Sequence, residues 1–333
     1  MMQPRLVDTF GREITYLRVS VTDRCNLRCR YCMAGDVSFS PRQDVLTIEE
    51  LGSLTSAFVA CGIRKVRITG GEPLVRKGIM HLVEGLSRHL RTGALDELCM
   101  TTNGVLLSKY ARGLADCGVR RLNVSLDTLD PERFAEITSG GDLDTVLKGI
   151  DAARDAGLAI KLNAVAQKGY IEQDAEALVR FAQDRHLDIT FIETMPLGEV
   201  RNNCADHYLP LDELRRLIER RWKLIDTDES SGGPARYVRV ANTGGLIGFI
   251  TALSHCFCGD CNRIRLSATG SLYTCLGHED ATDLRGLVRQ GADLETIENA
   301  IHGAVAAKPK SHGFGTSPGR EPALKRHMSV LGG

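Results

Sequence analysis

Residues 20–33 have the sequence SVTDRCNLRCRYCM and overlap the end of an apolar segment, residues 17–21, that predicts a β-strand. Cys25, Cys29 and Cys32 are spaced C-x3-C-x2-C in the loop after this strand, where α/β enzymes usually place the active site. Three close thiolates without a fourth are typical of a 4Fe-4S cluster with one open iron. Zinc is the alternative, but no histidine lies near this loop and the spacing is not that of ordinary zinc knuckles.

Strands alternate with amphipathic helical segments from residue 15 to about residue 194, which indicates βαβ units and a parallel sheet. The predicted strands cover residues 17–21, 65–69, 98–102, 121–126, 159–165 and 188–193. Thr47 and Glu50 fit a capping box at the start of the first helix. Six βα units are fewer than the eight of a closed barrel, so the α/β fold is expected to be an open, partial (β/α)6 barrel.

The pattern of predicted strands and helices changes after the linker-like segment SSGGP, residues 230–234. Short β segments with glycine turns come next, then helical segments near residues 280–290 and 294–305 and an irregular stretch from Lys308. We therefore predict two domains. Residues 1–230 form the partial barrel with the first cluster, and residues 231–333 form a smaller domain that carries a second cluster and closes the barrel.

Composition limits the classes of function. Lys+Arg and Asp+Glu both total 42 of 333 residues, so the balanced charge gives no case for binding nucleic acid or a membrane surface. The sequence has no signal-peptide segment and no apolar run long enough to span a membrane, which predicts a cytoplasmic protein. Its eleven cysteines cluster at metal-ligand spacings, so we expect reduced thiolates rather than disulfides.

The two faces of the predicted strands differ in polarity, because side chains alternate with a period of two. One face is apolar and is expected to pack under the helices. The other face is polar and is expected to line the interior; it carries Arg18, Ser20, Arg67, Thr69, Thr101, Asn123, Ser125, Asp127, Lys161 and Asn163. Buried cations without partners are costly, which favours an anionic ligand in the interior. Internal salt bridges to Asp127 and Glu193 are the alternative.

A second set of three cysteines lies in the C-terminal region. Cys258-x2-Cys261 is followed after thirteen residues by Cys275, again leaving one iron of a cluster without a protein ligand. A zinc ribbon completed by His255, His278 or Cys256 is the alternative. Arg263 and Arg265 lie on one face of the strand that follows, and paired guanidinium groups suit a phosphate chain better than a structural zinc.

These motifs together resemble the radical SAM superfamily. The match includes residues 20–33, with an aromatic residue before the third cysteine, and the TGGEP segment at residues 69–73. The resemblance implies that S-adenosylmethionine (SAM) binds the open iron through its amino and carboxylate groups. It also implies one-electron cleavage of SAM to a 5'-deoxyadenosyl radical, with the protein supplying orientation and dryness.

Nearly the whole chain resembles one branch of that superfamily, the GTP 3',8-cyclase family of molybdenum cofactor biosynthesis. The matching segments are LRVS (17–20), TTNG (101–104), NVSLD (123–127), FIE (191–193), MPLG (195–198), FCGDCNRIRLS (257–267) and the final Gly332-Gly333. This resemblance implies conversion of GTP to (8S)-3',8-cyclo-7,8-dihydroguanosine 5'-triphosphate. The radical would remove the ribose 3' hydrogen, and the second cluster would bind guanine.

The resemblance also implies roles for individual residues. Contacts to SAM are implied for Tyr31, Gly71, Ser125 and Met195. Contacts to GTP are implied for Arg18, Arg67, Thr101, Lys161, Arg263 and Arg265. The double-glycine tail, Gly332 and Gly333, would reach the active site and act in catalysis with Arg18, Arg263 and Arg265. Family properties further imply a homodimer, with cyclic pyranopterin monophosphate synthase as the recipient of the product. Within the irregular stretch, His312 also resembles a family position.

Two positions depart from the family pattern. Thr190 stands where members commonly carry an arginine, so one polar contact is missing or replaced. Cys256 adds a thiol beside the second set of cysteines, and we predict that it is a bystander rather than an alternative ligand.

Two other functions compete with this prediction. A peptide-modifying radical SAM enzyme would have a more cysteine-rich C-terminal region and less use for a cationic cavity. An iron-sulfur or zinc sensor that binds nucleic acid would need a basic recognition helix, which the sequence lacks.

Overall fold

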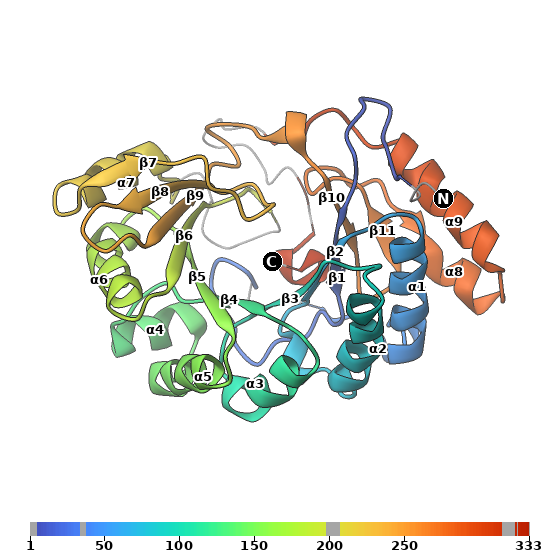
Figure 1. Cartoon of the computed structure of the whole chain (residues 1–333), viewed down its shortest axis with the longest axis horizontal. Helices are drawn as coiled ribbons and strands as arrows, with labels where there is room; N and C mark the ends of the chain where they lie inside the picture. The colour runs from blue at the N-terminus through green and yellow to red at the C-terminus, as the bar shows by residue number, and fades with distance from the viewer. Residues whose placement is uncertain (1–4, 34–37, 198–206, 315–323, 325, 333) are drawn as a thin grey trace.

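One mixed sheet organises the chain in the computed structural model, which describes residues 5–33, 38–197, 207–314, 324 and 326–332. Its middle consists of six parallel strands (Figure 1): β1 (Tyr16–Ser20), β2 (Lys65–Thr69), β3 (Glu97–Thr102), β4 (Arg121–Ser125), β5 (Ala159–Ala166) and β6 (Asp188–Glu193). Each strand predicted from the sequence is present to within one residue at either end.

Helices follow these strands and lie around the outside of the curved sheet (Figure 1). They are α1 (Ile48–Ala60), α2 (Ile79–Arg91), α3 (Leu107–Asp116), α4 (Pro131–Thr138), α5 (Leu143–Asp155), α6 (Ile171–Asp184) and α7 (Leu211–Glu219). The predicted capping box is confirmed, because the Thr47 hydroxyl accepts from the Glu50 N–H and the Glu50 carboxylate accepts from the Thr47 N–H.

Strands from the C-terminal region extend the same sheet at both edges. Beside β1 lie β10 (Arg263–Leu266), β11 (Ser271–Tyr273) and β12 (Thr282–Asp283); beside β6 lie β9 (Leu246–Ile250), β8 (Arg236–Val240) and β7 (Leu224–Asp226). Within the described ranges, no hydrogen bonds join β12 to β7, so the sheet stays open. The expected open, partial barrel is therefore confirmed. The division at residue 230 stays a prediction, and β7, which precedes it, pairs with β8, which follows it.

The remaining helices are α8 (Leu284–Arg289), α9 (Leu294–Ala306) and α10 (Met328–Leu331), and short 3-10 turns span Arg42–Asp44, Pro73–Val75 and Cys258–Asp260. Helices α8 and α9 pack on α1 and lie within a few residues of the predicted segments. Helix α10 differs from the irregular structure predicted for the stretch from Lys308. No helix in the described part of the chain has the length and apolar character needed to cross a lipid bilayer.

The two faces of the sheet separate apolar from polar side chains. Leu17, Val66, Leu98, Leu122 and Leu162 are fully or almost fully buried in the apolar core between the sheet and the helices. The opposite face turns inward and carries the polar side chains. This division follows from the period-two alternation of the strands, and it leaves the polar face available for a ligand.

Candidate functional site

A cavity of about 360 Å³ lies against the inner face of the strands, a volume typical of small-molecule sites. Both predicted sets of cysteines contribute to its wall. Among the described residues that line the cavity, seven are lysine or arginine and one, Glu193, is acidic. The cavity is therefore suited to a ligand that carries several negative charges.

The first cysteine set lies in the loop after β1. Cys25, Cys29 and Cys32 form no disulfide with any other described residue, and all three line the cavity. The Cys25 sulfur accepts from the Leu27 N–H at 3.4 Å and from the Asn103 side chain at 3.6 Å, contacts that stabilise a thiolate. Burial raises the pKa of Cys32 to about 12, so deprotonation needs a bound cation, as a metal centre supplies. Three converging thiols fit the predicted 4Fe-4S cluster.

The loop after β2 packs directly on the cysteine loop. The Gly71 N–H donates to the Thr22 carbonyl at 2.7 Å, and the Glu72 N–H donates to the Arg24 carbonyl at 2.9 Å. A Cβ at Gly71 would meet backbone atoms, including the Asp23 oxygen at 2.9 Å. Glycine is therefore required here for the close approach of two backbones.

Gly71→Ala is expected to lower the free energy of unfolding by about 1–3 kcal/mol, because the new methyl group would press on backbone that cannot move aside cheaply. Chemical denaturation of the cluster-free protein would measure this loss. Gly52→Ala is the matched control, since its Cβ would meet only Leu82 at 3.8 Å. Equal stability of the two variants would contradict the proposed packing.

The residues predicted to contact SAM lie together on the cavity wall. Tyr31, Gly71, Ser125 and Met195 all line the cavity, from four different loops and strand ends. The Tyr31 hydroxyl donates to the Asp127 carboxylate at 2.7 Å, which fixes the ring beside the cysteines. Burial raises the pKa of Asp127 to about 6. The structure thus brings these four residues together; their contact with SAM stays a prediction.

Three arginines stand side by side across neighbouring strands. The register pairs Arg18 of β1 with Arg265 of β10 on one side and with Arg67 of β2 on the other. We call Arg18, Arg67 and Arg265 the arginine row. Burial, followed by the charges of Arg18 and Arg263, lowers the pKa of Arg265 well below its ordinary value. Like charges on adjacent strands repel one another, so the row is suited to an anionic ligand.

The other predicted GTP-binding residues lie beside the arginine row. Arg67 donates to the Tyr16 hydroxyl and to the Thr101 hydroxyl, the latter at 3.3 Å. Lys161, only 5% exposed, donates to the Tyr237 hydroxyl at 2.8 Å. Burial, followed by the charges of Arg121 and Arg67, lowers the pKa of Lys161 to about 7. A negative charge nearby would therefore favour its ammonium form.

Internal salt bridges to Asp127 and Glu193, the alternative to an anionic ligand, do not account for the charge of Lys161. Asp127 accepts from Tyr31 and from the Val165 N–H at 2.8 Å. Glu193 accepts from the backbone N–H groups of Leu253 and Ser254, at 2.7 and 3.1 Å. In the described part of the chain, these hydrogen bonds of Asp127 and Glu193 come from backbone N–H groups and a tyrosine, and not from the inward-facing cations.

The second cysteine set also contributes to the cavity wall. Cys258, Cys261 and Cys275 line the cavity close to Arg263 and Arg265. Burial acts to raise the pKa of Cys261, but the charges of Arg263 and Lys308 outweigh burial and lower it. The ammonium of Lys308 is 3.7 Å from the Cys261 sulfur and donates to the Arg263 carbonyl at 3.0 Å. These three thiols also fit the predicted second cluster.

The histidines named as alternative zinc ligands are engaged elsewhere. His255 Nε2 lies 3.3 Å from the Asp212 carboxylate, and His278 Nε2 lies 3.0 Å from the Ser311 carbonyl. The imidazole that does lie beside Cys256 and Cys258 belongs to His312.

The C-terminal tail returns to the arginine row. The Gly332 carbonyl accepts from Arg265 Nη1 at 2.7 Å, and the backbone N–H of Ser329 donates to the Cys32 sulfur. Gly332 is buried with φ = 74°, and a Cβ there would lie 2.6 Å from the Thr69 Cβ. The structure therefore places Gly332 between the first cysteine loop and the arginine row. Gly333 lies outside the described residues.

The chain is similar to known proteins over nearly its whole length. Over 329 residues the chain is 55% identical to the GTP 3',8-cyclase of Nitrobacter winogradskyi, covering 99% of this chain and 96% of that protein. It is 56% identical to the GTP 3',8-cyclase of Bradyrhizobium diazoefficiens, covering 98% and 96%.

The chain belongs to the GTP 3',8-cyclase family.

Two family models match successive parts of the chain. The radical SAM superfamily matches residues 19–182, and Molybdenum Cofactor Synthesis C matches residues 187–314. Membership of the radical SAM superfamily implies an enzyme that holds a 4Fe-4S cluster and SAM.

Solved structures share the fold at low sequence identity. The crystal structure of Streptococcus suis SuiB superposes with a TM-score of 0.62 at 16% identity, covering 89% of this chain and 69% of that chain. SuiB bound to S-adenosylmethionine gives a TM-score of 0.61 at 16% identity, covering 96% and 78%. These likenesses support the predicted radical SAM fold.

Thr190, which departs from the family pattern, lies on the inner face beside Asn163. It is fully buried, and its hydroxyl has no hydrogen-bond partner among the described residues. A Cβ at the facing Gly248 would lie 2.8 Å from that hydroxyl and 3.0 Å from the Tyr237 ring. The Tyr237 ring thus occupies part of the space that a longer side chain at position 190 would need.

Sequence reasoning missed two groups that shape the site. Tyr16 anchors Arg67, and Lys65 lies 5.0 Å from its ring; both residues fit the period-two alternation that singled out Arg18 and Arg67. Arg12 donates to the carbonyls of Cys258 and Pro309, both at 2.7 Å, and so ties the N-terminal segment to the second cysteine set. No local pattern around Arg12 could have indicated that role.

Proposed function

We propose that this chain converts GTP to (8S)-3',8-cyclo-7,8-dihydroguanosine 5'-triphosphate in molybdenum cofactor biosynthesis. The observation that carries the proposal is one cavity walled by two three-cysteine sets with the arginine row beside them. The Nitrobacter and Bradyrhizobium relatives carry the same activity in their names. The first cysteine set matches SAM, and the second cysteine set and the arginine row match GTP.

We assign a 4Fe-4S cluster to each cysteine set. Cys25, Cys29 and Cys32 would hold the first and leave one iron for SAM; Cys258, Cys261 and Cys275 would hold the second and leave one iron for guanine. When bound, the first cluster and SAM supply reductive cleavage of SAM and removal of a substrate hydrogen. The protein's own part is to hold both ligands in register and to exclude water.

Charge explains why the second ligand would be a nucleoside triphosphate. Arg18, Arg263 and Arg265 lie on adjacent strands near the second cysteine set, so their guanidinium groups can bind successive phosphates with guanine at the cluster. Arg67, Thr101 and Lys161 would hold the ribose and remaining charge. A triphosphate would offset the repulsion that these cations exert on one another in the free enzyme.

The competing functions fit the cavity less well. SuiB, whose structure has been solved with its precursor peptide, shares the fold at 18% identity, and that degree of likeness supports no common substrate. A cavity with seven lysines and arginines and one carboxylate suits a small polyanion better than a peptide. A sensor of nucleic acid would present its cations outward rather than toward two cysteine sets.

We further propose that the enzyme acts in the cytoplasm as a homodimer and passes its product to cyclic pyranopterin monophosphate synthase. The basis is the family resemblance. Size-exclusion chromatography with light scattering would test the dimer.

Nucleotide dependence of SAM cleavage tests the proposed reaction. Anaerobically reconstituted enzyme with SAM and a strong reductant is expected to form 5'-deoxyadenosine much faster with GTP than with ATP, CTP or UTP, and to yield the cyclised product. The same rate of 5'-deoxyadenosine formation with every nucleotide would contradict GTP as the substrate and favour the peptide-modifying alternative.

Lys161 gives a pH-dependent prediction. Its pKa is about 7 in the free enzyme, and a bound triphosphate favours the ammonium form. Above pH 7, GTP binding is therefore expected to take up close to one proton at Lys161, so GTP affinity falls as pH rises. Calorimetry in buffers of different ionisation enthalpy would measure this uptake. Proton uptake of the same size in Lys161→Met would contradict the assignment.

A further inference from the structure

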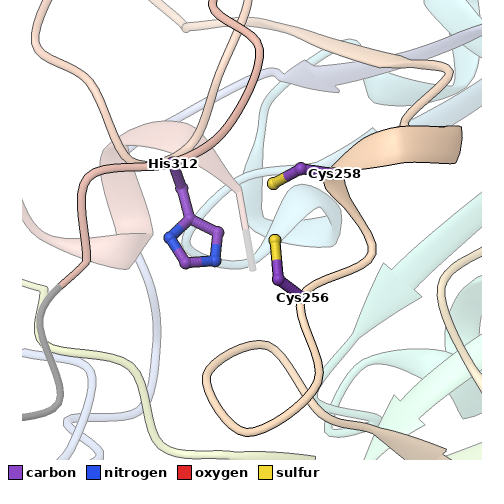
Figure 2. A group of neighbouring side chains, drawn as sticks. All are labelled: Cys256, Cys258 and His312. Carbon is purple, nitrogen blue, oxygen red and sulfur yellow. The ribbon is translucent and has the colours of Figure 1, made fainter.

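Three potential metal ligands meet beside the second cysteine set. Cys256 and Cys258 lie on the loop after β9, and His312 lies on the segment after α9. One ligand atom from each lies within 4.8 Å of the other two. Figure 2 shows the two sulfur atoms and the imidazole ring turned toward one shared space. The two thiols are also hydrogen-bonded to each other.

This spacing suits a single ion better than a cluster. Two thiolates on one tetrahedral zinc, with Zn–S bonds of about 2.3 Å, lie about 3.8 Å apart. Thiolates that bind different irons of one cluster lie farther apart, because the irons themselves are separated. Two hydrogen-bonded sulfurs with an imidazole alongside therefore match part of a tetrahedral Cys2His site, with a fourth position open to water.

The His312 ring is already oriented by its neighbours. Its Nδ1 accepts from the Phe314 N–H at 3.2 Å, and its Nε2 lies 3.0 Å from the Ala252 carbonyl. Hydrogen bonds of this kind fix ring orientation in metal sites. A metal–nitrogen bond would replace one of these two contacts, and the other ring nitrogen would then carry the proton.

We propose that Cys256, Cys258 and His312 bind one thiophilic divalent cation, such as Zn²⁺, when the second cluster is absent. The two thiols lose their protons to solvent as the metal–sulfur bonds form, and no redox change is needed. Cys258 is shared with the proposed second cluster, so the cation and the cluster exclude each other. This mutual exclusion rests on the proposed function, whereas cation binding does not.

Cobalt titration of the full-length, cluster-free protein tests the site. Cys25→Ala, Cys29→Ala and Cys32→Ala together provide a parent from which the first cysteine set is removed. The parent is expected to bind one Co²⁺ with thiolate-to-cobalt absorption and the visible bands of a tetrahedral ion. Cys256→Ser and His312→Gln are each expected to weaken binding at least about 100-fold. Cys261→Ser is the matched control and is expected to leave the affinity unchanged.

Three outcomes would overturn the proposal. They are a parent that binds no cobalt, a His312→Gln variant with unchanged affinity, and loss of binding in Cys261→Ser with retention in Cys256→Ser. The last result would place the ion on Cys258, Cys261 and Cys275. Circular dichroism of each variant shows whether it has folded, and Cys256→Ala provides a second test if Cys256→Ser has not.

Competition tests the shared ligand. The same parent, loaded with one Zn²⁺ and then supplied with iron and sulfide, is expected to assemble several-fold less cluster than zinc-treated Cys256→Ser. Equal iron and sulfide contents would contradict mutual exclusion. If the cobalt titration contradicts the cation site while the enzyme still converts GTP, the proposed function stands, because the titration uses neither GTP nor SAM.

Discussion

Gly332→Ala is expected to lower the rate of GTP-dependent SAM cleavage by at least about 100-fold, the usual consequence of displacing reacting groups by about 1 Å. Gly332 has φ = 74°, and a Cβ would press on the Thr69 side chain, at 2.6 Å from its Cβ. The tail would have to withdraw, and the bond from Arg265 to the Gly332 carbonyl would be lost. Deleting Gly332 and Gly333 should have the same effect.

Iron content and the matched control make this result interpretable. Both clusters should load normally, because none of their proposed ligands changes. Gly93→Ala is the control. Gly93 has φ = 72°, and a Cβ there would meet no described atom within 4 Å. This variant therefore shows only the effect of placing alanine in left-handed backbone. A Gly332→Ala enzyme with the full cleavage rate would show that the tail does not need its close approach to Thr69.

Arg265→Met is expected to weaken GTP binding by about 2–5 kcal/mol, which is roughly 30-fold to several thousand-fold. Arg265 pairs with Arg18 across β10 and β1 and lines the cavity together with the second cysteine set, so its guanidinium group is placed to neutralise a phosphate there. Arg265→Lys keeps the charge but loses the planar fork, so its loss should be smaller. Equilibrium binding of GTP to reconstituted enzyme without reductant measures both.

Arg285→Met is the matched control for Arg265→Met. Arg285 forms an ion pair with Asp44 at 3.0 Å and is not among the residues that line the cavity. Its replacement should leave GTP affinity unchanged. Equal GTP affinity in Arg265→Met and the unmodified enzyme would remove the arginine row from the proposed substrate site.

Local pattern was sufficient to predict the strands and their faces. Arg18 and Arg67 alternate with apolar neighbours along their strands, so the direction of their side chains follows from the pleat. The positions of the cysteine loop and the Gly70–Glu72 loop follow from being at the ends of adjacent parallel strands. These relations involve residues close in sequence, which is why the sequence reveals them.

Long-range pairing could not be predicted in the same way. The arginine row exists because β10 pairs with β1, although more than two hundred residues separate them. No alternation within either strand indicates that pairing. Likewise, the sequence marks His312 only as a family position, and its place beside Cys258 depends on how the segment after α9 crosses the cavity.

The isotope content of 5'-deoxyadenosine formed from GTP deuterated at the ribose 3' carbon tests the central claim most directly. The claim is that one cavity holds SAM and GTP so that the SAM-derived fragment removes that hydrogen. The account predicts deoxyadenosine carrying one deuterium, formed together with the cyclised product. Deoxyadenosine without deuterium, formed at a GTP-dependent rate, would contradict it.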